Sequence, residues 1–134
     1  MAEPALVTDT HPLIYWVARS TRLGKRALRH FEACERREAI LYVPAAVIWE
    51  TALLSRSGRF TLDRPIRSLF EDLFSNPAYQ PLDLTPEQVF LAAETFPAGD
   101  PFDALIVAAA MSLGLPLLTR DARLQASEAV RTVW

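Results

Sequence analysis

The chain has 134 residues, of which 51% are hydrophobic and 22% charged, and its formal net charge is -2. This composition excludes a disordered chain and predicts one compact domain over residues 1–134. The single cysteine, Cys34, excludes an intramolecular disulfide and a cysteine-based zinc site. Residues 1–20 lack the pattern of a signal peptide, and no apolar run is as long as a membrane span. We therefore expect a soluble, cytoplasmic protein without a membrane partner.

The amino-terminal part alternates strand and helix. Residues 5–8 are predicted to form a buried strand that ends at Asp9, and a helix follows from Thr10 to about Ala18. In a parallel sheet, an acid that directly follows a strand lies at the carboxyl edge, where ligands bind. Asp9 is therefore either a loop or capping residue, or part of a ligand site.

A basic helix is predicted over residues 22–37. Its residues expected to face the core are Leu23, Ala27, Leu28 and Phe31. Its outer side carries many cations, which a solvated surface would explain. The alternative is a surface that contacts the phosphates of a nucleic acid or a protein partner. The residues that would make this contact are Arg22, Lys25, Arg26 and Arg29.

An acid lies within the next helix, which is predicted over residues 45–57 and follows a strand at 40–43. At helical spacing, Glu50 falls on the same side as several apolar residues of that helix. Two interpretations remain open. Glu50 either bonds a nearby cation such as Arg56 at the edge of the core, or points into a shared cavity.

The following segments continue the alternation. Residues 65–75 form an amphipathic helix whose apolar stripe is core or dimer surface, and Thr85-x-x-Gln88 starts a helix that runs to about Thr95. The other expected elements are strands over 79–84, 116–119 and 130–134, a loop over 97–99, and a turn or short helix over 121–127. Helices that alternate with short apolar strands indicate an α/β fold around a parallel sheet.

One apolar helix has clearly marked ends. Asp100 suits the N-cap, Pro101 suits the first helical position, and Gly114 is a natural helix stop. Capping explains Asp100 better than it explains Asp103, which shares a face with core residues such as Ile106. A carboxylate that faces a core needs a partner, because its desolvation is costly, and few cations are expected nearby.

Four acids are expected to converge. Two follow strands, one opens the apolar helix and one lies in a covering helix; in that order they are Asp9, Asp121, Asp103 and Glu50. Clustered carboxylates repel one another, so their pKa values rise unless a cation neutralises them. Oxygen ligands without His or Cys suit Mg²⁺ or Mn²⁺. Such an ion can activate water and stabilise the charge of a transition state, which predicts hydrolysis of a phosphodiester.

At this point the sequence resembles the PIN-domain ribonucleases, and among them the VapC-type toxins of bacterial toxin–antitoxin pairs. The matching segments are Val-Thr-Asp-Thr-His at 7–11, Pro-Ala-Ala-Val-Ile-Trp-Glu at 44–50, Asp-Pro-Phe-Asp-Ala-Leu-Ile at 100–106 and Leu-Thr-Arg-Asp at 118–121. The resemblance covers the whole chain and implies a five-stranded parallel sheet with helices on both faces.

The resemblance also implies the site and its partners. The acids implied to hold Mg²⁺ or Mn²⁺ for RNA cleavage are Asp9, Glu50, Asp103 and Asp121, and the supporting residues are Asp100, Thr119 and Thr10. It further implies a homodimer, held inactive by a small antitoxin whose tail occupies the active-site groove.

Two positions depart from the pattern of this subgroup. Many similar members have a histidine two residues before Asp100 and an arginine after Asp103, where this chain has Ala98 and Ala104. Neither position is a metal ligand, so we still expect activity. Substrate preference and antitoxin contacts do not transfer.

Three rival classes of protein match the sequence less well. A haloacid-dehalogenase-type phosphatase needs a second aspartate two residues after Asp9, where His11 stands. A response-regulator receiver needs a lysine after a late strand, and the only lysine is Lys25, in an early helix. The third rival is a catalytically silent PIN fold that acts as an interaction module, against which the four retained acids argue.

Overall fold

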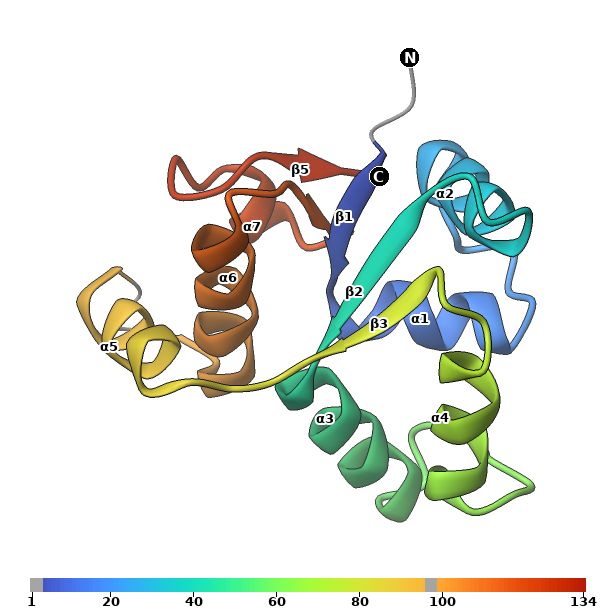
Figure 1. Cartoon of the computed structure of the whole chain (residues 1–134). Helices are drawn as coiled ribbons and strands as arrows, with labels where there is room; N and C mark the ends of the chain where they lie inside the picture. The colour runs from blue at the N-terminus through green and yellow to red at the C-terminus, as the bar shows by residue number, and fades with distance from the viewer. Residues whose placement is uncertain (1–3, 96–98) are drawn as a thin grey trace.

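Five strands form one parallel sheet in the order β3-β2-β1-β4-β5. The computed structural model describes residues 4–95 and 99–134 (Figure 1). The strands are β1 (Ala5–Thr8), β2 (Ile40–Pro44), β3 (Tyr79–Leu82), β4 (Leu117–Leu118) and β5 (Thr132–Val133). The predicted parallel α/β sheet is confirmed.

Helices cover both faces of this sheet. They are α1 (Thr10–Val17), α2 (Lys25–Glu35), α3 (Ala45–Arg56), α4 (Ile66–Phe74), α5 (Pro86–Thr95), α6 (Pro101–Leu113) and α7 (Ala122–Gln125). Figure 1 shows α5 and α6 on one side of the sheet and α1, α2 and α4 on the other. Among the described helices, none combines the length and the apolar character needed to cross a bilayer.

The strand order reverses beside β1. The chain passes from β1 to β2 and β3, and then returns to place β4 on the free side of β1. Thr8 at the end of β1 is in register with Leu118 at the end of β4. Such a reversal leaves a crevice at the carboxyl ends of the two strands, which is where ligands bind in open parallel sheets.

Strands β1 and β4 are largely buried on both faces, as their continuous apolar runs predict, whereas Ile40 of β2 and Pro81 of β3 are exposed. Val7, Leu41, Val43 and Leu117 are fully buried. The last two strands are shorter than predicted, but their hydrogen bonding continues beyond the strand limits. The Val7 N–H donates to the carbonyl of Pro116, and the Thr119 N–H donates to that of Val133. The sheet therefore fixes the backbone up to the residues that precede Asp121.

Helix α6 confirms the predicted caps. The Asp100 carboxylate accepts a hydrogen bond of 2.7 Å from the Phe102 N–H, and Pro101 occupies the first turn. Gly114 ends the helix with a φ of 64°, a left-handed conformation that favours glycine. Residues 106–110 are fully buried, so α6 is held along its length and presents its amino-terminal turn at the sheet edge.

Two details of the predicted basic helix are wrong. Helix α2 begins at Lys25 rather than residue 22, because Gly24 occupies the N-cap position. Leu28 was expected to face the core and is 40% exposed. The buried stripe runs through Ala27, Phe31 and Cys34, and Leu28 lies about 100° around the helix from Ala27.

The apolar stripe of α4 packs into the core. Leu69 and Phe70 are buried, and Ile66, Leu73 and Phe74 are partly buried against core residues. Core packing thus accounts for part of this stripe, while Ile66, Phe70 and Phe74 also line a hollow beside Ile48, and the dimer surface stays a prediction.

Candidate active site

Five carboxylates line one cavity of about 300 Å³. It lies where β1 leads into α1 and β4 into α7, between the middle of α3 and the start of α6. The acids are Asp9, Glu50, Asp100, Asp103 and Asp121, and the other lining residues are His11, Tyr15, Arg120 and Arg123. The four acids that the sequence singled out thus share one space, with Asp100 beside them.

Asp9 is held at both carboxylate oxygens. Its Oδ1 accepts a hydrogen bond of 2.8 Å from the Thr10 N–H, and its Oδ2 accepts one of 2.7 Å from the Thr119 hydroxyl. Only 6% of the residue is exposed. Burial raises the pKa of Asp9, and the hydrogen bonds from Thr119 and Thr10 offset part of the rise.

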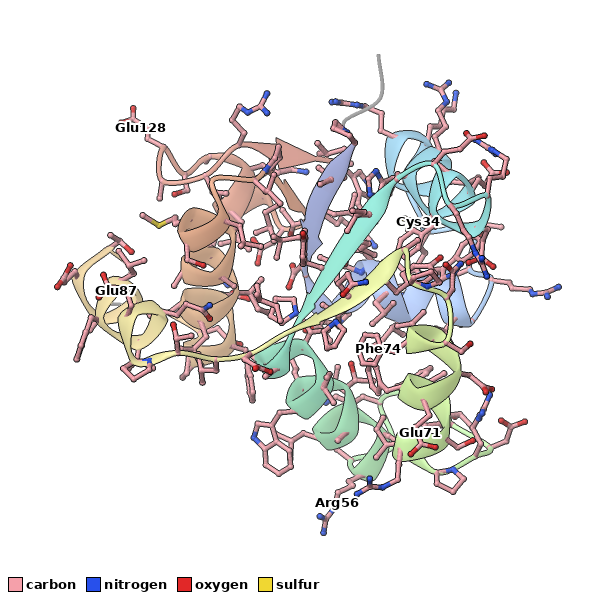
Figure 2. All side chains as sticks on the ribbon, viewed as in Figure 1. Cys34, Arg56, Glu71, Phe74, Glu87 and Glu128 are labelled. Carbon is pink, nitrogen blue, oxygen red and sulfur yellow. The ribbon has the colours of Figure 1, made fainter. Side chains whose placement is uncertain are left out.

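Glu50 reaches the same cavity from α3. The Thr10 hydroxyl donates a hydrogen bond of 2.5 Å to Glu50 Oε1, so Thr10 contacts both Asp9 and Glu50. The interpretation that pairs Glu50 with Arg56 is wrong: Arg56 ends α3 and points outward (Figure 2). Burial raises the pKa of Glu50, the Thr10 hydrogen bond lowers it, and repulsion by Asp9 raises it further.

Asp103 has a cation partner that the sequence reasoning missed. Arg123 Nη2 lies 3.2 Å from Asp103 Oδ2 and 3.5 Å from Asp121 Oδ2. The expectation of few nearby cations is therefore wrong. The available signal was the position of Arg123, which lies two residues after the strand-end acid Asp121.

Arg123 neutralises Asp103 only weakly. The Asp103 side chain is 12% exposed, whereas the Arg123 side chain is 64% exposed and its charge is screened by water. Burial, followed by repulsion from Asp9 and the other site acids, raises the pKa of Asp103 to about 7. Asp103 therefore holds a proton in a large fraction of molecules near neutral pH.

Thr119 joins the two strand ends. Its hydroxyl donates to Asp9, and its Oγ1 accepts a hydrogen bond of 3.1 Å from the Asp121 N–H. The Asp121 carboxylate accepts a bond of 2.8 Å from the Arg123 N–H and thereby caps α7. The threonine is fully buried, so it fixes these two acids relative to each other.

The cations predicted to meet RNA or a partner lie elsewhere. Arg22, Lys25, Arg26 and Arg29 do not line the acidic cavity, and Arg26 lines a separate hollow beside β5. The cations that line the cavity are Arg120 and Arg123. His11 and Tyr15 also line it without having been predicted as site residues; their proximity to Asp9 on α1 was the available signal.

The two departures from the subgroup pattern have different outcomes. Ala98, with most of the loop predicted over 97–99, lies outside the described residues. Ala104 follows Asp103 in the first turn of α6 and does not line the cavity.

The donor set fits a divalent cation that prefers oxygen ligands. Asp9, Glu50 and Asp103 all have raised pKa values, because burial and mutual repulsion disfavour their charged forms. A bound cation would relieve both effects. As the side chains stand, no three acidic, His or Cys side chains within the described part of the chain form a ready ligand group. The Arg123 guanidinium forms ion pairs with the carboxylates of Asp103 and Asp121. A metal ion bound by these two carboxylates would therefore displace the guanidinium.

The sheet order and the acidic cavity at the β1–β4 crevice define an α/β protein of the PIN type. The sequence profile of the PIN domain matches residues 6–129, and the chain belongs to this family. A relative, Ribonuclease VapC22 of Mycobacterium tuberculosis, is 31% identical over 135 residues, which cover 96% of this chain and 98% of the relative. The predicted family is therefore confirmed.

Solved structures share the fold at low sequence identity. VapBC2 from Rickettsia felis, bound to a DNA fragment from its promoter, has a TM-score of 0.70 and 12% identity, over 96% of this chain and 97% of that chain. A toxin–antitoxin complex from Klebsiella pneumoniae has a TM-score of 0.60 and 16% identity, over 96% of each chain. At these identities the similarity shows the fold alone.

Proposed function

We propose that this protein is an endoribonuclease that hydrolyses RNA phosphodiester bonds with the aid of Mg²⁺ or Mn²⁺. The observation that carries the proposal is the cavity into which four separate chain segments bring carboxylates. Membership of the PIN family and the 31% identity to a ribonuclease support it. The proposed ligands and catalytic residues are Asp9, Glu50, Asp103 and Asp121, with Thr10, Asp100 and Thr119 supporting them.

We assign a role to each site residue from its hydrogen bonds, its pKa and its position in the cavity. A bound divalent ion supplies water activation and stabilises the charge of the transition state. Asp9, fixed by Thr10 and Thr119, sets the position of the ligand group. Asp103, whose pKa is about 7, holds a proton at its carboxylate in a large fraction of molecules near neutral pH when no metal ion is bound. Arg120 and Arg123 line the same cavity and can bind a phosphate of the substrate.

We also propose a role as the toxin of a toxin–antitoxin pair that acts in the cytoplasm. A structural neighbour is itself a toxin–antitoxin complex, which supports a protein antitoxin as partner. A homodimer is proposed from the family resemblance. The antitoxin would keep RNA away from the acidic cavity.

The proposal is tested by an RNA cleavage assay on purified protein free of antitoxin. Cleavage is expected with Mg²⁺ or Mn²⁺ and is expected to be lost in EDTA and in Asp103→Asn. The matched control is Asp63→Asn, because Asp63 is an exposed acid outside the cavity. Its cleavage rate is expected to equal that of the unmodified protein.

Two results would overturn the proposal. Equal cleavage by Asp103→Asn and the unmodified protein would assign the activity to a contaminating enzyme. Absence of both cleavage and Mn²⁺-induced thermal stabilisation in the antitoxin-free protein would instead favour the silent interaction module. Thermal stabilisation by Mn²⁺ that disappears in Asp103→Asn would support the metal site independently of the RNA chosen.

A further inference from the structure

A row of three aromatic rings borders the acidic cavity. His11 and Tyr15 lie one turn apart on α1, with ring centroids 6.1 Å apart and planes inclined at 56°. Tyr15 in turn meets Trp134 edge to face, at 6.4 Å and 64°. His11 is exposed, whereas Tyr15 and Trp134 are half-buried. We call His11, Tyr15 and Trp134 the aromatic row.

Tyr15 connects the cavity to a second hollow. It lines the acidic cavity and also a groove of about 750 Å³ whose other lining residues include Trp16, Arg19 and Leu23. Tyr15 therefore lies between the acidic cavity and this groove, which Glu35 also lines. The metal-ligand set proposed above assigns no role to Tyr15.

A cation is held against the same tyrosine. Arg120 Nη1 donates a hydrogen bond of 3.2 Å to the Tyr15 hydroxyl, and Arg120 also lines the acidic cavity. Because the guanidinium bonds a phenol rather than a carboxylate, its charge is not neutralised by this partner. It can therefore contact a phosphate at the cavity wall while the Tyr15 ring lies next to it.

The far end of the row adjoins the start of the basic helix. The Arg26 N–H donates a hydrogen bond of 3.1 Å to the Trp134 carbonyl. Gly24 packs against the Trp134 indole so closely that a Cβ there would lie 2.8 Å from Cδ1. Lys25 and Arg26 therefore begin α2 directly beside Trp134. Their positive charges lie at the end of the aromatic row that is farther from the acidic cavity.

We propose that the aromatic row and Arg120 form a subsite for single-stranded RNA, an inference that rests on the proposed ribonuclease function. A base next to the cleaved bond stacks on His11 or Tyr15, Arg120 contacts the adjoining phosphate, and the strand leads toward Lys25. Unpaired bases can stack on aromatic side chains, whereas bases inside an A-form duplex cannot reach them. The subsite therefore selects unpaired RNA.

The test measures stacking without cleavage. Asp103→Asn serves as the parent protein, because it is expected to be inactive and lacks one repelling carboxylate. It is titrated into a single-stranded oligoribonucleotide that contains 2-aminopurine, whose fluorescence is quenched when it stacks. Tyr15→Leu is expected to abolish most quenching and to weaken binding about 5- to 100-fold, the range found when one base–aromatic stack is removed.

Further variants separate stacking from structural damage. Tyr15→Phe keeps the ring and is expected to keep the quenching, while it loses the hydrogen bond from Arg120. His11→Ala changes an exposed ring without removing packing from the core. Phe90→Leu is the matched control, because Phe90 is 57% exposed and lies outside the cavity. In the otherwise unmodified enzyme, Tyr15→Leu is expected to raise KM and leave both kcat and Mn²⁺-induced thermal stabilisation nearly unchanged.

The outcomes distinguish this inference from the proposed function. Cleavage by the unmodified protein, with quenching and KM unaffected by Tyr15→Leu and His11→Ala, would overturn the subsite and leave the nuclease intact. Quenching that depends on Tyr15 in a protein that cleaves no RNA would support the subsite and overturn the nuclease. Absence of RNA binding to the parent protein would overturn the subsite, as would equal quenching by a fully paired duplex.

Discussion

The β1–α1 and β4–α7 junctions share one sequence pattern and differ in structure. Each runs from a buried strand through a short polar stretch into a helix that an acid caps. Asp9 at the first junction is 6% exposed, whereas the side chain of Asp121 at the second is 29% exposed. Both acids line the same cavity. The same local pattern thus yields one buried and one accessible carboxylate.

Asp9 and Asp121 differ in exposure because the elements and hydrogen-bond partners around them differ. Strand β1 has four residues and continues into a helix of eight, while β4 has two residues and leads into a helix of four. The side chain of Asp9 is bonded by a backbone N–H and a buried hydroxyl. Asp121 is bonded by a backbone N–H and an exposed guanidinium. Asp9 is fixed by the fold, and Asp121 retains freedom to adjust to an ion.

The largest expected effect is the loss of cleavage when Asp9 is replaced, compared with the smaller loss when Asp121 is replaced. Asp9→Asn is expected to lower metal-dependent cleavage about 1,000-fold and Asp121→Asn about 10-fold, because a rigidly positioned charge contributes more than an adjustable one. The measurement is kcat/KM at saturating Mn²⁺, with Asp63→Asn as control. Equal losses in the two variants would contradict the assignment of different roles to the two junctions.

Thr119 connects the two junctions through its hydrogen bonds to Asp9 and Asp121, so a substitution there tests that connection. Thr119→Val keeps the shape but removes the donor to Asp9 and the acceptor for the Asp121 N–H. We expect Mn²⁺ to bind about 10-fold more weakly and the free energy of unfolding to fall by about 1–2 kcal/mol. Isothermal titration and urea denaturation measure these quantities. Thr119→Ser should retain most of both, and a Ser variant as impaired as Val would refute the hydrogen-bond explanation.

Replacement of the exposed Arg123 tests whether the carboxylate of Asp121 at the β4–α7 junction is free to bind an ion. Arg123→Gln is expected to strengthen Mn²⁺ binding about 3- to 10-fold, because the guanidinium no longer competes for Asp103 and Asp121. The matched control is Arg36→Gln, which breaks an exposed ion pair with Glu38 and should leave Mn²⁺ binding unchanged. Weaker Mn²⁺ binding by Arg123→Gln alone would show that Arg123 supports the ligand group instead of competing for it.

The smallest expected effect is a pH dependence of stability in the absence of metal. The pKa of Asp103 is about 7 in the folded protein against 3.8 for an unperturbed aspartate, so the folded state binds the proton more tightly. Its contribution to stability is complete below the lower value and is lost as pH rises through about 7. Asp103→Asn removes this dependence.

Thermal melts in EDTA at about pH 5 and about pH 8 measure the effect. The unmodified protein is expected to lose about 3–8 °C more of its melting temperature over this interval than Asp103→Asn does. The difference between the two proteins reports the proton on Asp103 together with the repulsion between Asp103 and its neighbours Asp9 and Glu50. Parallel losses would show that the pKa of Asp103 is not raised.

The sequence by itself determined the elements that carry the acids. Strand 5–8, the caps of α6 at Asp100 and Gly114, and the hydrogen bond from the Gln88 N–H to Thr85 Oγ1 all follow from interactions within a few residues. The parallel direction of the strands also follows from the alternation of helices and strands, whereas their order in the sheet does not. The wrong start of α2 had a local cause, because Gly24 occupies the N-cap, and Leu28 lies outside the buried stripe that runs through Ala27 and Phe31.

Only the tertiary structure decided how the acids are held. Thr119 and Asp9 are 110 residues apart, Thr10 and Glu50 are 40 apart, and Arg123 and Asp103 are 20 apart. No local periodicity links such pairs, because their proximity arises from packing the strands and helices together. That packing places Arg123 rather than Arg56 in the cavity. It also makes Tyr15 part of the cavity wall. The sequence placed the acids on their elements, and the fold selected their partners.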